Sequence, residues 1–477
     1  MTLLLGIDIG TTTICGVAVS AGGELCCAVE RPNDAQAAGL PRGRAEQDPI
    51  VIRRRCLEVL AELAGRVAGE KPAAIGLTGQ MHGMLCLDAD NRPLGRLITW
   101  QDQRCLEPAG DGLTWIEAMR SRVPDEEWQP CGCLPAAGFL GSTLYWLVRN
   151  HALPAGTQRV AFIHDWLAAA LAGTAPTTDP GDAASSGLFD LARMKWHDGI
   201  VRALDLPGGL LPPVRESGQV LGGLTPEIAA AVGLPAGTPV CNATGDNQAS
   251  VLGSIAEPDR SVLVNLGTGG QISWAIPAFR REPDMETRYL PPGRYMLVGA
   301  SLCGGRAYGW LNDVVRGWLA AFGVQLDRQQ VYARLNELAA SAPADCRGLT
   351  ADTALAGTRG DASRRGAFLG VSLDNFDLPC VARAVLAGAV EELCRFHDRH
   401  GPREAHDRVV ASGNAVRKNP LLRRLISGRM RRPVLIPAHR EEAAFGAALL
   451  AGVGTGVFRD AAEAGRCVRC LADEDQA

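Results

Sequence analysis

The stretch from Leu3 to Val19 reads LLLGIDIGTTTICGVAV, and it decides the fold of the first half of the chain. Apolar residues dominate up to Ile9, a glycine and three threonines turn the chain, and Ile14–Val19 is again largely apolar. This pattern predicts a β-hairpin with a small, hydroxyl-rich tip. Asp8 lies inside the first strand, where burying a carboxylate is costly, so we expect it to have a functional role.

The same pattern returns at Ser261–Ile276, which reads SVLVNLGTGGQISWAI. Ser261–Leu266 is predicted as a strand, Gly267–Gly270 as a turn and Gln271–Ile276 as the returning strand. Two matching hairpins, one near the start of each half of the chain, predict two related domains that face each other.

The two hairpin tips have the chemistry of phosphate-binding loops. Glycine lets the backbone approach a ligand closely, successive turn N–H groups form an anion-binding concavity, and threonine hydroxyls add donors. Neither tip is a Walker loop, because the Gly-Lys-Ser/Thr ending occurs nowhere in the chain. One such tip alone is better explained as an ordinary turn. The matching pair favours phosphate, with Asp8 holding Mg²⁺ directly or through water.

A third segment supplies a candidate catalytic base. Thr238–Thr244 is predicted as a strand, and the following GDNQAS, residues 245–250, opens a helix. At the end of a strand, Asp246 is placed to take the proton of an attacking hydroxyl in a cleft. From this segment alone, the alternative is that Asp246 is the N-cap residue of the helix.

Length, charge and cysteine usage exclude several classes of function. A chain of 477 residues exceeds what one hydrophobic core usually serves, which predicts two large domains. A net charge of −4 gives no reason to expect a nucleic-acid partner. The longest apolar stretch, residues 443–458, is shorter than a membrane span and is predicted as a buried core helix. An odd number of cysteines, 15, without a signal peptide predicts reduced thiols and a cytoplasmic protein.

Together these motifs resemble those of the FGGY carbohydrate kinases, in the actin/hexokinase-like ATPase superfamily. Residues 6–12 (GIDIGTT) resemble the family's first phosphate hairpin, and residues 267–269 (GTG) resemble its second. Residues 245–249 (GDNQA) resemble its catalytic-base segment, and residues 411–415 (ASGNA) its adenosine loop. The motifs follow the family's order from residue 6 to about residue 450, so the resemblance covers nearly the whole chain.

Finer matches point to a subgroup of that family. Residues 79–83 (GQMHG) are similar to the sugar-binding segment of xylulokinases and sedoheptulokinases. The segments 99–104 (TWQDQR) and 163–165 (IHD) resemble sedoheptulokinases more closely than xylulokinases. Structural readings stay open for several side chains: Trp100 as a core residue, His82 as a satisfied buried histidine and His164 as a helix N-terminal residue.

The resemblance implies roles for individual residues. Asp246 would be the catalytic base, and Asp8 the partner of Mg²⁺. The sugar would contact Gln80, Met81, His82, Trp100, Asp102 and Asp246. ATP would be held by Thr11, Thr12, Gly267, Thr268, Gly305, Gly413 and Asn414. In-line phosphoryl transfer needs mostly positioning and charge neutralisation, which such donors and one base can supply.

The fold implied is α/β, with two ribonuclease-H-like (actin/hexokinase-type ATPase) domains flanking a deep catalytic cleft. Residues 1–254 would hold the sugar and the base, residues 255–462 the nucleotide, and residues 463–477 would form a frayed tail. The implied function is ATP-dependent phosphorylation of sedoheptulose to its 7-phosphate, by a monomer or homodimer with no membrane partner. The alternatives are a kinase for another ketose or polyol, such as xylulose or ribulose, and a non-catalytic sugar and nucleotide sensor.

This chain departs from the family's pattern at Cys15, where relatives often have Lys or Arg. The change removes a cation that could steady the ATP phosphates, and it is the one feature that favours the sensor. Retention of Asp8 and Asp246 favours an active enzyme. The adenosine loop also departs, because it reads Ser-Gly-Asn where many relatives have consecutive glycines.

Overall fold

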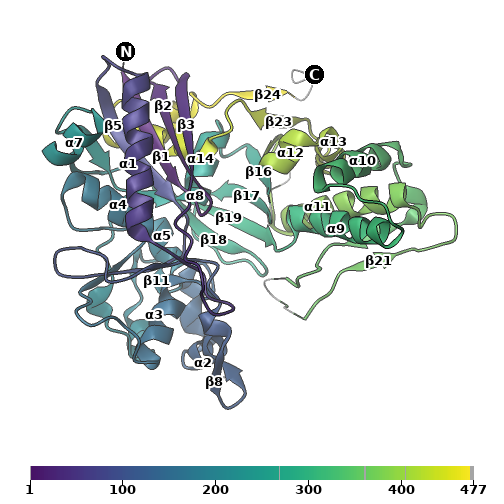
Figure 1. Ribbon diagram of the computed structural model, residues 1–477, viewed down its shortest axis with the longest axis horizontal. Helices are drawn as coiled ribbons and strands as arrows, with labels where there is room; N and C mark the ends of the chain where they lie inside the picture. The colour runs from purple at the N-terminus through teal and green to yellow at the C-terminus, as the bar shows by residue number, and fades with distance from the viewer. Residues whose placement is uncertain (1, 268, 359–360, 362, 403, 473–477) are drawn as a thin grey trace.

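The chain folds around two seven-stranded mixed sheets (Figure 1), and the computed structural model describes residues 2–267, 269–358, 361, 363–402 and 404–472. The first sheet has the order β13–β14–β5–β1–β2–β3, with β15 also paired to β5. Its strands are β1 (Leu3–Ile9), β2 (Thr13–Ser20), β3 (Leu25–Pro32), β5 (Pro72–Gly79), β13 (Val220–Gly223), β14 (Pro239–Cys241) and β15 (Thr244–Gly245).

The second sheet has the order β18–β19–β17–β16–β22–β23–β24. Its strands are β16 (Ser261–Leu266), β17 (Gly270–Ile276), β18 (Glu286–Leu290), β19 (Arg294–Ser301), β22 (Arg408–Ser412), β23 (Val434–Pro437) and β24 (Cys470–Ala472). In both sheets three neighbouring strands pair antiparallel, β1–β2–β3 in the first and β16–β17–β19 in the second. Two later strands continue parallel to the first of these strands, β5 and β14 in the first sheet and β22 and β23 in the second. The repeat predicted from two hairpins therefore extends to two whole sheets.

Both predicted hairpins are confirmed. Strands β1 and β2 pair from Leu3↔Ser20 to Ile9↔Ile14 around the first tip. Strands β16 and β17 pair up to Leu266↔Gly270 around the second tip. The first tip therefore projects from the middle of its sheet, because β1 also pairs with β5 on its other side.

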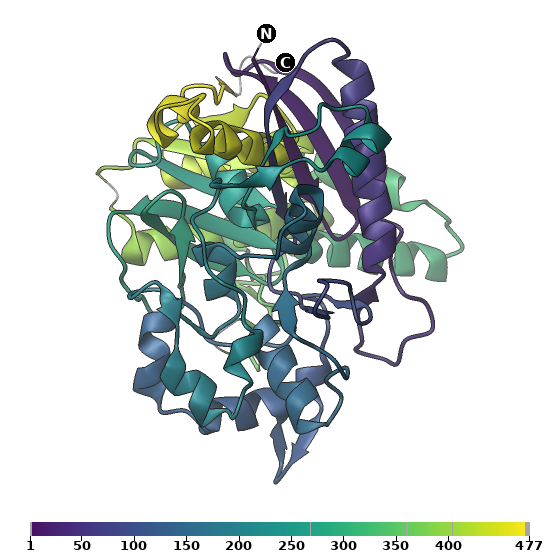
Figure 2. The ribbon, with the colours of Figure 1, turned by 90° about the vertical axis from the view of Figure 1, so that its left-hand side faces the viewer.

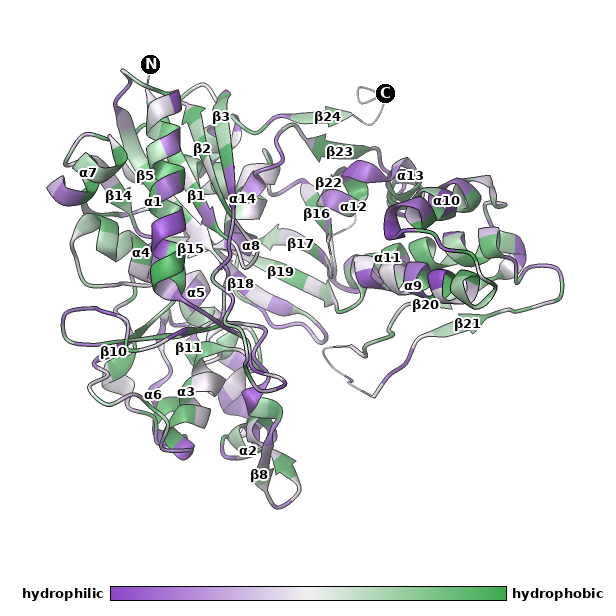
Figure 3. Cartoon of the chain, in the orientation of Figure 1, coloured by the Kyte–Doolittle hydropathy of each residue, from purple (hydrophilic) through white to green (hydrophobic). Residues whose placement is uncertain are grey.

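Helices on one face of the first sheet cover its apolar side chains. Helix α1 (Pro49–Arg66) begins after Asp48, whose carboxylate caps the amides of Ile50 and Val51. Its buried side includes Ile52, while bands of hydrophilic residues mark the rest of its surface in Figure 3. Helices α4 (Ile163–Ala172) and α7 (Pro226–Val232) share this core with α1.

Two helices connect the sheets, and their close packing requires glycine. Helix α8 (Asp246–Ser254) crosses α14 (Glu442–Gly454), and a Cβ at Gly446 would overlap the carbonyl oxygen of Ala249. Helix α14 also packs on the first sheet, where a Cβ at Gly6 would overlap the carbonyl oxygen of Ala444. The buried helix predicted within residues 443–458 is therefore confirmed. It comes from the C-terminal half of the chain but completes the core of the first sheet.

The long connection between β5 and β13 builds a lobe below the first sheet, coloured blue to blue-green in Figure 2. Its main elements are β4 (Glu46–Gln47, which precedes the connection), β7 (Leu97–Ile98), α2 (Trp115–Ser121), α3 (Leu140–Arg149), α5 (Pro180–Ser185) and α6 (Asp198–Ala203). A separate apolar cluster that includes Trp128 and Phe162 holds this lobe together.

The second sheet is covered by helices that Figure 1 shows on the right. They are α9 (Gly304–Ala321), α10 (Arg328–Ser341), α11 (Leu378–His400), α12 (Asn414–Lys418) and α13 (Pro420–Met430). The tail predicted to fray from residue 463 is instead ordered through residue 472, because β24 pairs with the edge strand β23. Residues 473–477 lie outside the described part of the chain. Across the described residues, no helix combines the length and apolar character that crossing a membrane requires.

Candidate active site

Asp246 stands where a strand of the first sheet becomes a helix. Strand β15 pairs with Thr78 and Gly79 of β5 and leads directly into α8. The N-cap residue of α8 is Gly245, and no side chain caps this end, so the N-cap reading of Asp246 is wrong. Burial raises the pKa of Asp246 above its ordinary value, while the charges of His164 and Arg288 oppose that rise. A carboxylate with a raised pKa is suited to general-base chemistry.

Asp8 lies on β1 between Cys15 of β2 and Thr78 of β5. Its Oδ1 atom is buried and lacks a hydrogen-bond partner in the described structure. Burial, and then the negative charge of Asp246, raise the pKa of Asp8 to about 8. Two carboxylates that repel each other, one with an orphaned oxygen, fit the oxygen-ligand chemistry of Mg²⁺.

Cys15, where relatives often have Lys or Arg, leaves Asp8 without a positive charge on the neighbouring strand. The Cys15 thiol is half-buried, and burial followed by the charge of Asp8 raises its pKa far above the ordinary range. The side chain on the strand beside Asp8 is therefore neutral. A lysine or arginine at this position would instead supply a positive charge next to Asp8.

A chain of hydrogen bonds joins the first hairpin tip to the predicted sugar segment. The Thr11 hydroxyl donates to Gln80 Oε1 at 3.1 Å and accepts from Trp100 Nε1 at 2.9 Å. The Gln80 amide donates to Gln47 Oε1 at 2.8 Å, and Gln47 returns a 2.8 Å bond to the Thr11 carbonyl. The Thr11 hydroxyl is thus tied to predicted sugar residues, whereas Thr12 is exposed at the tip.

Trp100, Met81 and His82, all predicted to contact the sugar, differ in their exposure and in their contacts. Trp100 is 46% exposed, so the core reading of this residue is wrong. Met81 is only 4% exposed and packs against Gly245, the residue before the candidate base. His82 has a positive φ of 73°, stacks on Phe139 with ring centroids 4.1 Å apart, and bonds the backbone through Nδ1 at 2.9 Å.

Asp102, predicted as a sugar contact, is bonded within the protein through both of its carboxylate oxygens. Its two carboxylate oxygens accept bonds of 2.7 and 2.9 Å from the Arg104 guanidinium, and of 2.9 Å from the amides of Ala45 and Arg104. The side chain is fully buried. With its oxygens committed to the protein, Asp102 fixes the loop that carries Trp100, and this geometry does not favour a direct sugar contact.

Buried acids lie behind the candidate base, and the sequence did not single them out as a group. His164 Nε2 is 2.7 Å from Asp182 Oδ2, and the ligand atoms of His164, Asp165 and Asp182 lie within 4.8 Å of one another. Burial raises the pKa of Asp165 and of Asp182 well above the ordinary value. Asp179 accepts from Asp182 N at 2.6 Å and from the Thr244 hydroxyl at 2.7 Å. These bonds hold β15, the strand that presents the base.

Three of the residues predicted to hold ATP line a cavity of about 1020 Å³ in the C-terminal half. Gly267, Gly305 and Asn414 all line it, and Gly305 N donates to the Gly267 carbonyl at 3.0 Å. Gly413 has a φ of 92°, and a Cβ there would lie 2.6 Å from the Leu266 carbonyl oxygen, so this position needs glycine. The cavity walls also carry Tyr308, Tyr332, Asn336 and Asn419. Thr11 and Thr12 do not line this cavity, and Thr268 lies outside the described residues.

Comparison with known proteins decides the family. The FGGY carbohydrate kinase N-terminal domain model matches residues 3–253, and the C-terminal domain model matches residues 267–455. The chain belongs to the FGGY family of carbohydrate kinases. It is 28% identical to the sedoheptulokinase of Homo sapiens over 94% of this chain and 97% of that protein. It is 25% identical to the xylulose kinase of Bacillus subtilis over 97% of this chain and 90% of that protein.

Solved structures support the fold. The xylulose kinase of Rhodospirillum rubrum superposes with a TM-score of 0.86 and 27% identity, covering all of this chain and 95% of that one. The predicted two-domain actin/hexokinase-type fold of this FGGY kinase is therefore confirmed, and its activity is that of a carbohydrate kinase.

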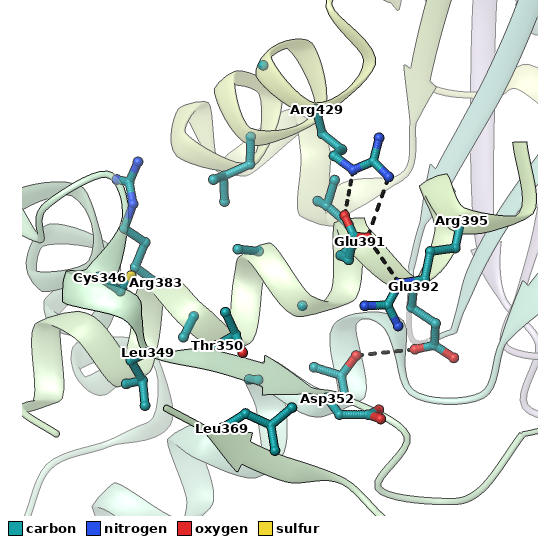
Figure 4. Close-up of a pocket in the computed structure, with 18 of the residues that line it drawn as sticks. Cys346, Leu349, Thr350, Asp352, Leu369, Arg383, Glu391, Glu392, Arg395 and Arg429 are labelled. Atoms are coloured by element: carbon teal, nitrogen blue, oxygen red, sulfur yellow. Dashed lines mark hydrogen bonds and ion pairs between the residues drawn. The ribbon is translucent and has the colours of Figure 1, made fainter. Parts of the chain in front are cut away.

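A further cavity of the FGGY kinase (Figure 4) is lined by residues of α11 other than those that line the 1020 Å³ cavity. It measures about 820 Å³, and none of the predicted site residues lines it. Arg395 and Arg429 both bond Glu391, at 3.0 and 2.5 Å. Glu392 accepts from the Ser301 hydroxyl at 2.8 Å, and Ser301 in turn accepts from the Gly304 amide at the start of α9. The charged side chains that line this cavity are thus largely paired with one another or with the start of α9.

Proposed function

We propose that this carbohydrate kinase transfers the γ-phosphoryl group of ATP to a terminal hydroxyl of a ketose, with sedoheptulose the preferred acceptor and the 7-phosphate its product. The observation that carries the proposal is the placement of Asp246. Its carboxylate is not used to cap α8, it has a raised pKa, and it follows the glycine against which Met81 packs.

Asp246 acts as the general base in this proposal. It accepts the proton of the sugar hydroxyl as that oxygen attacks the γ-phosphorus, and the bond from phosphorus to the β,γ-bridging oxygen breaks. The products are the sugar phosphate and ADP. Burial raises the pKa of Asp246 toward the operating pH, while the opposing charges of His164 and Arg288 favour the carboxylate form that accepts the proton.

ATP is expected in the 1020 Å³ cavity, with its phosphates directed toward the two hairpin tips. The glycerol kinase of Plasmodium falciparum, whose fold is shared, was solved with ADP. Asp8 is the residue expected to hold Mg²⁺, since its buried Oδ1 lacks a partner in the described structure. The ion would neutralise phosphate charge there.

The preference for sedoheptulose rests on residues around the sugar side. The TWQDQR and IHD segments resemble sedoheptulokinases, and the human sedoheptulokinase matches nearly the full length of this chain. Trp100 of the first segment donates a hydrogen bond to the Thr11 hydroxyl, and His164 of the second segment bonds Asp182. We further propose a cytoplasmic enzyme that works as a monomer or homodimer.

The test is a coupled ADP-release assay with MgATP and a panel of sedoheptulose, xylulose, ribulose, fructose and glycerol. The expected result is the highest kcat/KM for sedoheptulose, with the phosphorylated carbon identified as C7 by NMR of the product. A higher kcat/KM for xylulose or another acceptor would overturn the substrate assignment and leave the kinase mechanism in place. Sugar-independent ADP release alone would contradict the whole proposal.

A further inference from the structure

The edge strand β18 of the second sheet is fixed to the N-terminal half of the protein. On one side of residue 288, Thr287 N donates to the Gly132 carbonyl at 2.9 Å. On the other side, the Tyr289 hydroxyl donates to Glu216 Oε2 at 2.5 Å. The strand therefore carries the intervening residue, Arg288, to the junction between the two halves.

Arg288 is buried there, and its three guanidinium nitrogens differ in the strength of their hydrogen-bond acceptors. It is 7% exposed, and its Nε and Nη2 atoms donate to Glu286 Oε2 at 3.0 and 2.6 Å. Its Nη1 atom instead faces the Met81 sulfur at 4.0 Å. A thioether is a weak acceptor, and buried donors in folded proteins nearly always have a strong one. The Nη1 donors therefore point to an acceptor supplied by a ligand.

The position of this donor identifies the ligand. Met81 packs between Arg288 and Gly245, the residue that precedes Asp246. The charge of Arg288 acts on Asp246 and on Asp182. The Arg288 guanidinium, the Met81 thioether and the Asp246 carboxylate thus lie close to one another, where the acceptor sugar is expected to bind.

We propose that Arg288 is a substrate-contacting specificity residue, whose Nη1 donates a hydrogen bond to a hydroxyl oxygen of the bound sugar. This inference rests on the proposed function. Residues from both halves of the chain then form the acceptor site. Gln80, Met81 and His82 come from the N-terminal half and Arg288 from the C-terminal half. Glu286 holds the guanidinium plane through its other two nitrogens, so a lysine cannot reproduce both interactions.

The first experiment compares the variants Arg288→Met and Arg288→Lys with the wild type. Losing a hydrogen bond from a charged donor predicts a KM for the sugar that rises about 10-fold to 100-fold in Arg288→Met. The rise is smaller in Arg288→Lys, and the KM for ATP stays unchanged in both variants. The matched control is Arg294→Met on β19, because Arg294 pairs with Asp259 at the surface and its loss leaves both KM values unchanged.

The second experiment locates the hydroxyl with a set of monodeoxy ketoses. For one deoxy sugar, the kcat/KM of the wild type is expected to fall below its value with the unmodified sugar. The factor of this fall should about equal the factor by which Arg288→Met lowers kcat/KM for the unmodified sugar. With that deoxy sugar, Arg288→Met has the same kcat/KM as the wild type, because the hydroxyl that Arg288 would contact is already absent. If every deoxy sugar loses the same factor in both proteins, Arg288 contacts no sugar hydroxyl and the inference is overturned.

Binding measurements separate this inference from the proposed reaction. Calorimetric titration of the same ketoses into wild type and Arg288→Met needs no turnover. A wild type that binds a ketose without phosphorylating it would defeat the proposed reaction, while weaker binding by the variant would still support the Arg288 contact. Equal binding by the two proteins, or binding of no ketose by the wild type, would overturn the Arg288 contact.

Discussion

The ionised carboxylate of Asp8 is predicted to lower the free energy of unfolding. The substitution Asp8→Asn keeps the size of the side chain and removes its charge. In the absence of divalent ions, we expect this variant to be more stable than the wild type at alkaline pH and equally stable near pH 4. Its kcat is expected to fall, because the residue proposed to hold Mg²⁺ is lost.

The magnitude follows from the surroundings of the carboxyl group. Burial and the charge of Asp246 raise its pKa from 3.8 to about 8. Each unit corresponds to about 1.4 kcal/mol, so ionising Asp8 in the folded state costs at most ~6 kcal/mol. Since the side chain is only half-buried, solvent screening reduces this to about 2–3 kcal/mol.

The sign of the pH dependence is set by proton binding. Between about pH 4 and pH 8 the folded state holds a proton on Asp8 that the unfolded state has released. The stability that this proton confers is therefore complete below pH 4 and is lost as the pH rises through 8. An asparagine cannot ionise, so the difference between the two proteins grows across that window.

The assay is differential scanning calorimetry of both proteins in EDTA, at pH 5 and at pH 9. A gain of 2–3 kcal/mol predicts a Tm for Asp8→Asn that is roughly 2–3 °C above the wild type at pH 9, and a smaller difference at pH 5. Asp34→Asn is the control, because Asp34 is exposed and its bond to Arg55 lowers its pKa. A Tm difference that is the same at both pH values, or a less stable variant at pH 9, would refute the reasoning.

Three other substitutions separate the roles assigned in the site. Trp100→Phe removes the bond to Thr11, worth about 1 kcal/mol, and is expected to raise the KM for the sugar about fivefold; a rise in the KM for ATP alone would contradict a role of Trp100 at the sugar. Gly413→Ala forces a Cβ toward the Leu266 carbonyl at a φ of 92°, which costs about 1–3 kcal/mol and is expected to weaken ATP binding in a calorimetric titration. Asp102→Ala removes the bonds from Asp102 to the buried Arg104, which keeps Glu46 as an acidic partner, and we expect ~1–3 kcal/mol of lost stability by denaturant unfolding. A raised sugar KM with unchanged stability would restore Asp102 as a sugar contact.

The sequence predicted the features that depend on neighbouring residues. The alternation around GIDIGTTT and NLGTGG is local, and the structure confirms both hairpins to within a residue. The apolar run within residues 443–458 predicted a buried helix for the same reason. Small residues there, such as Gly446, had a packing role that composition alone did not reveal.

Long-range partners set what the sequence could not predict. Gln47 contacts Gln80 from the two-residue strand β4, Arg288 contacts Met81 from the C-terminal half of the chain, and no motif marks either of them. Asp102 matched a family segment, but its carboxylate is committed to Arg104 and Ala45. The tail was expected to fray because its composition is charged, yet a free sheet edge beside β23 orders it through residue 472.

The central claim is that Asp246 is the base of a sugar kinase, and the kinetics of Asp246→Asn test it most directly. With the best acceptor of the wild type, the variant is predicted to lose about 10²-fold to 10⁴-fold in kcat while both KM values change little. Retention of the wild-type kcat, with a change confined to either KM, would contradict the claim.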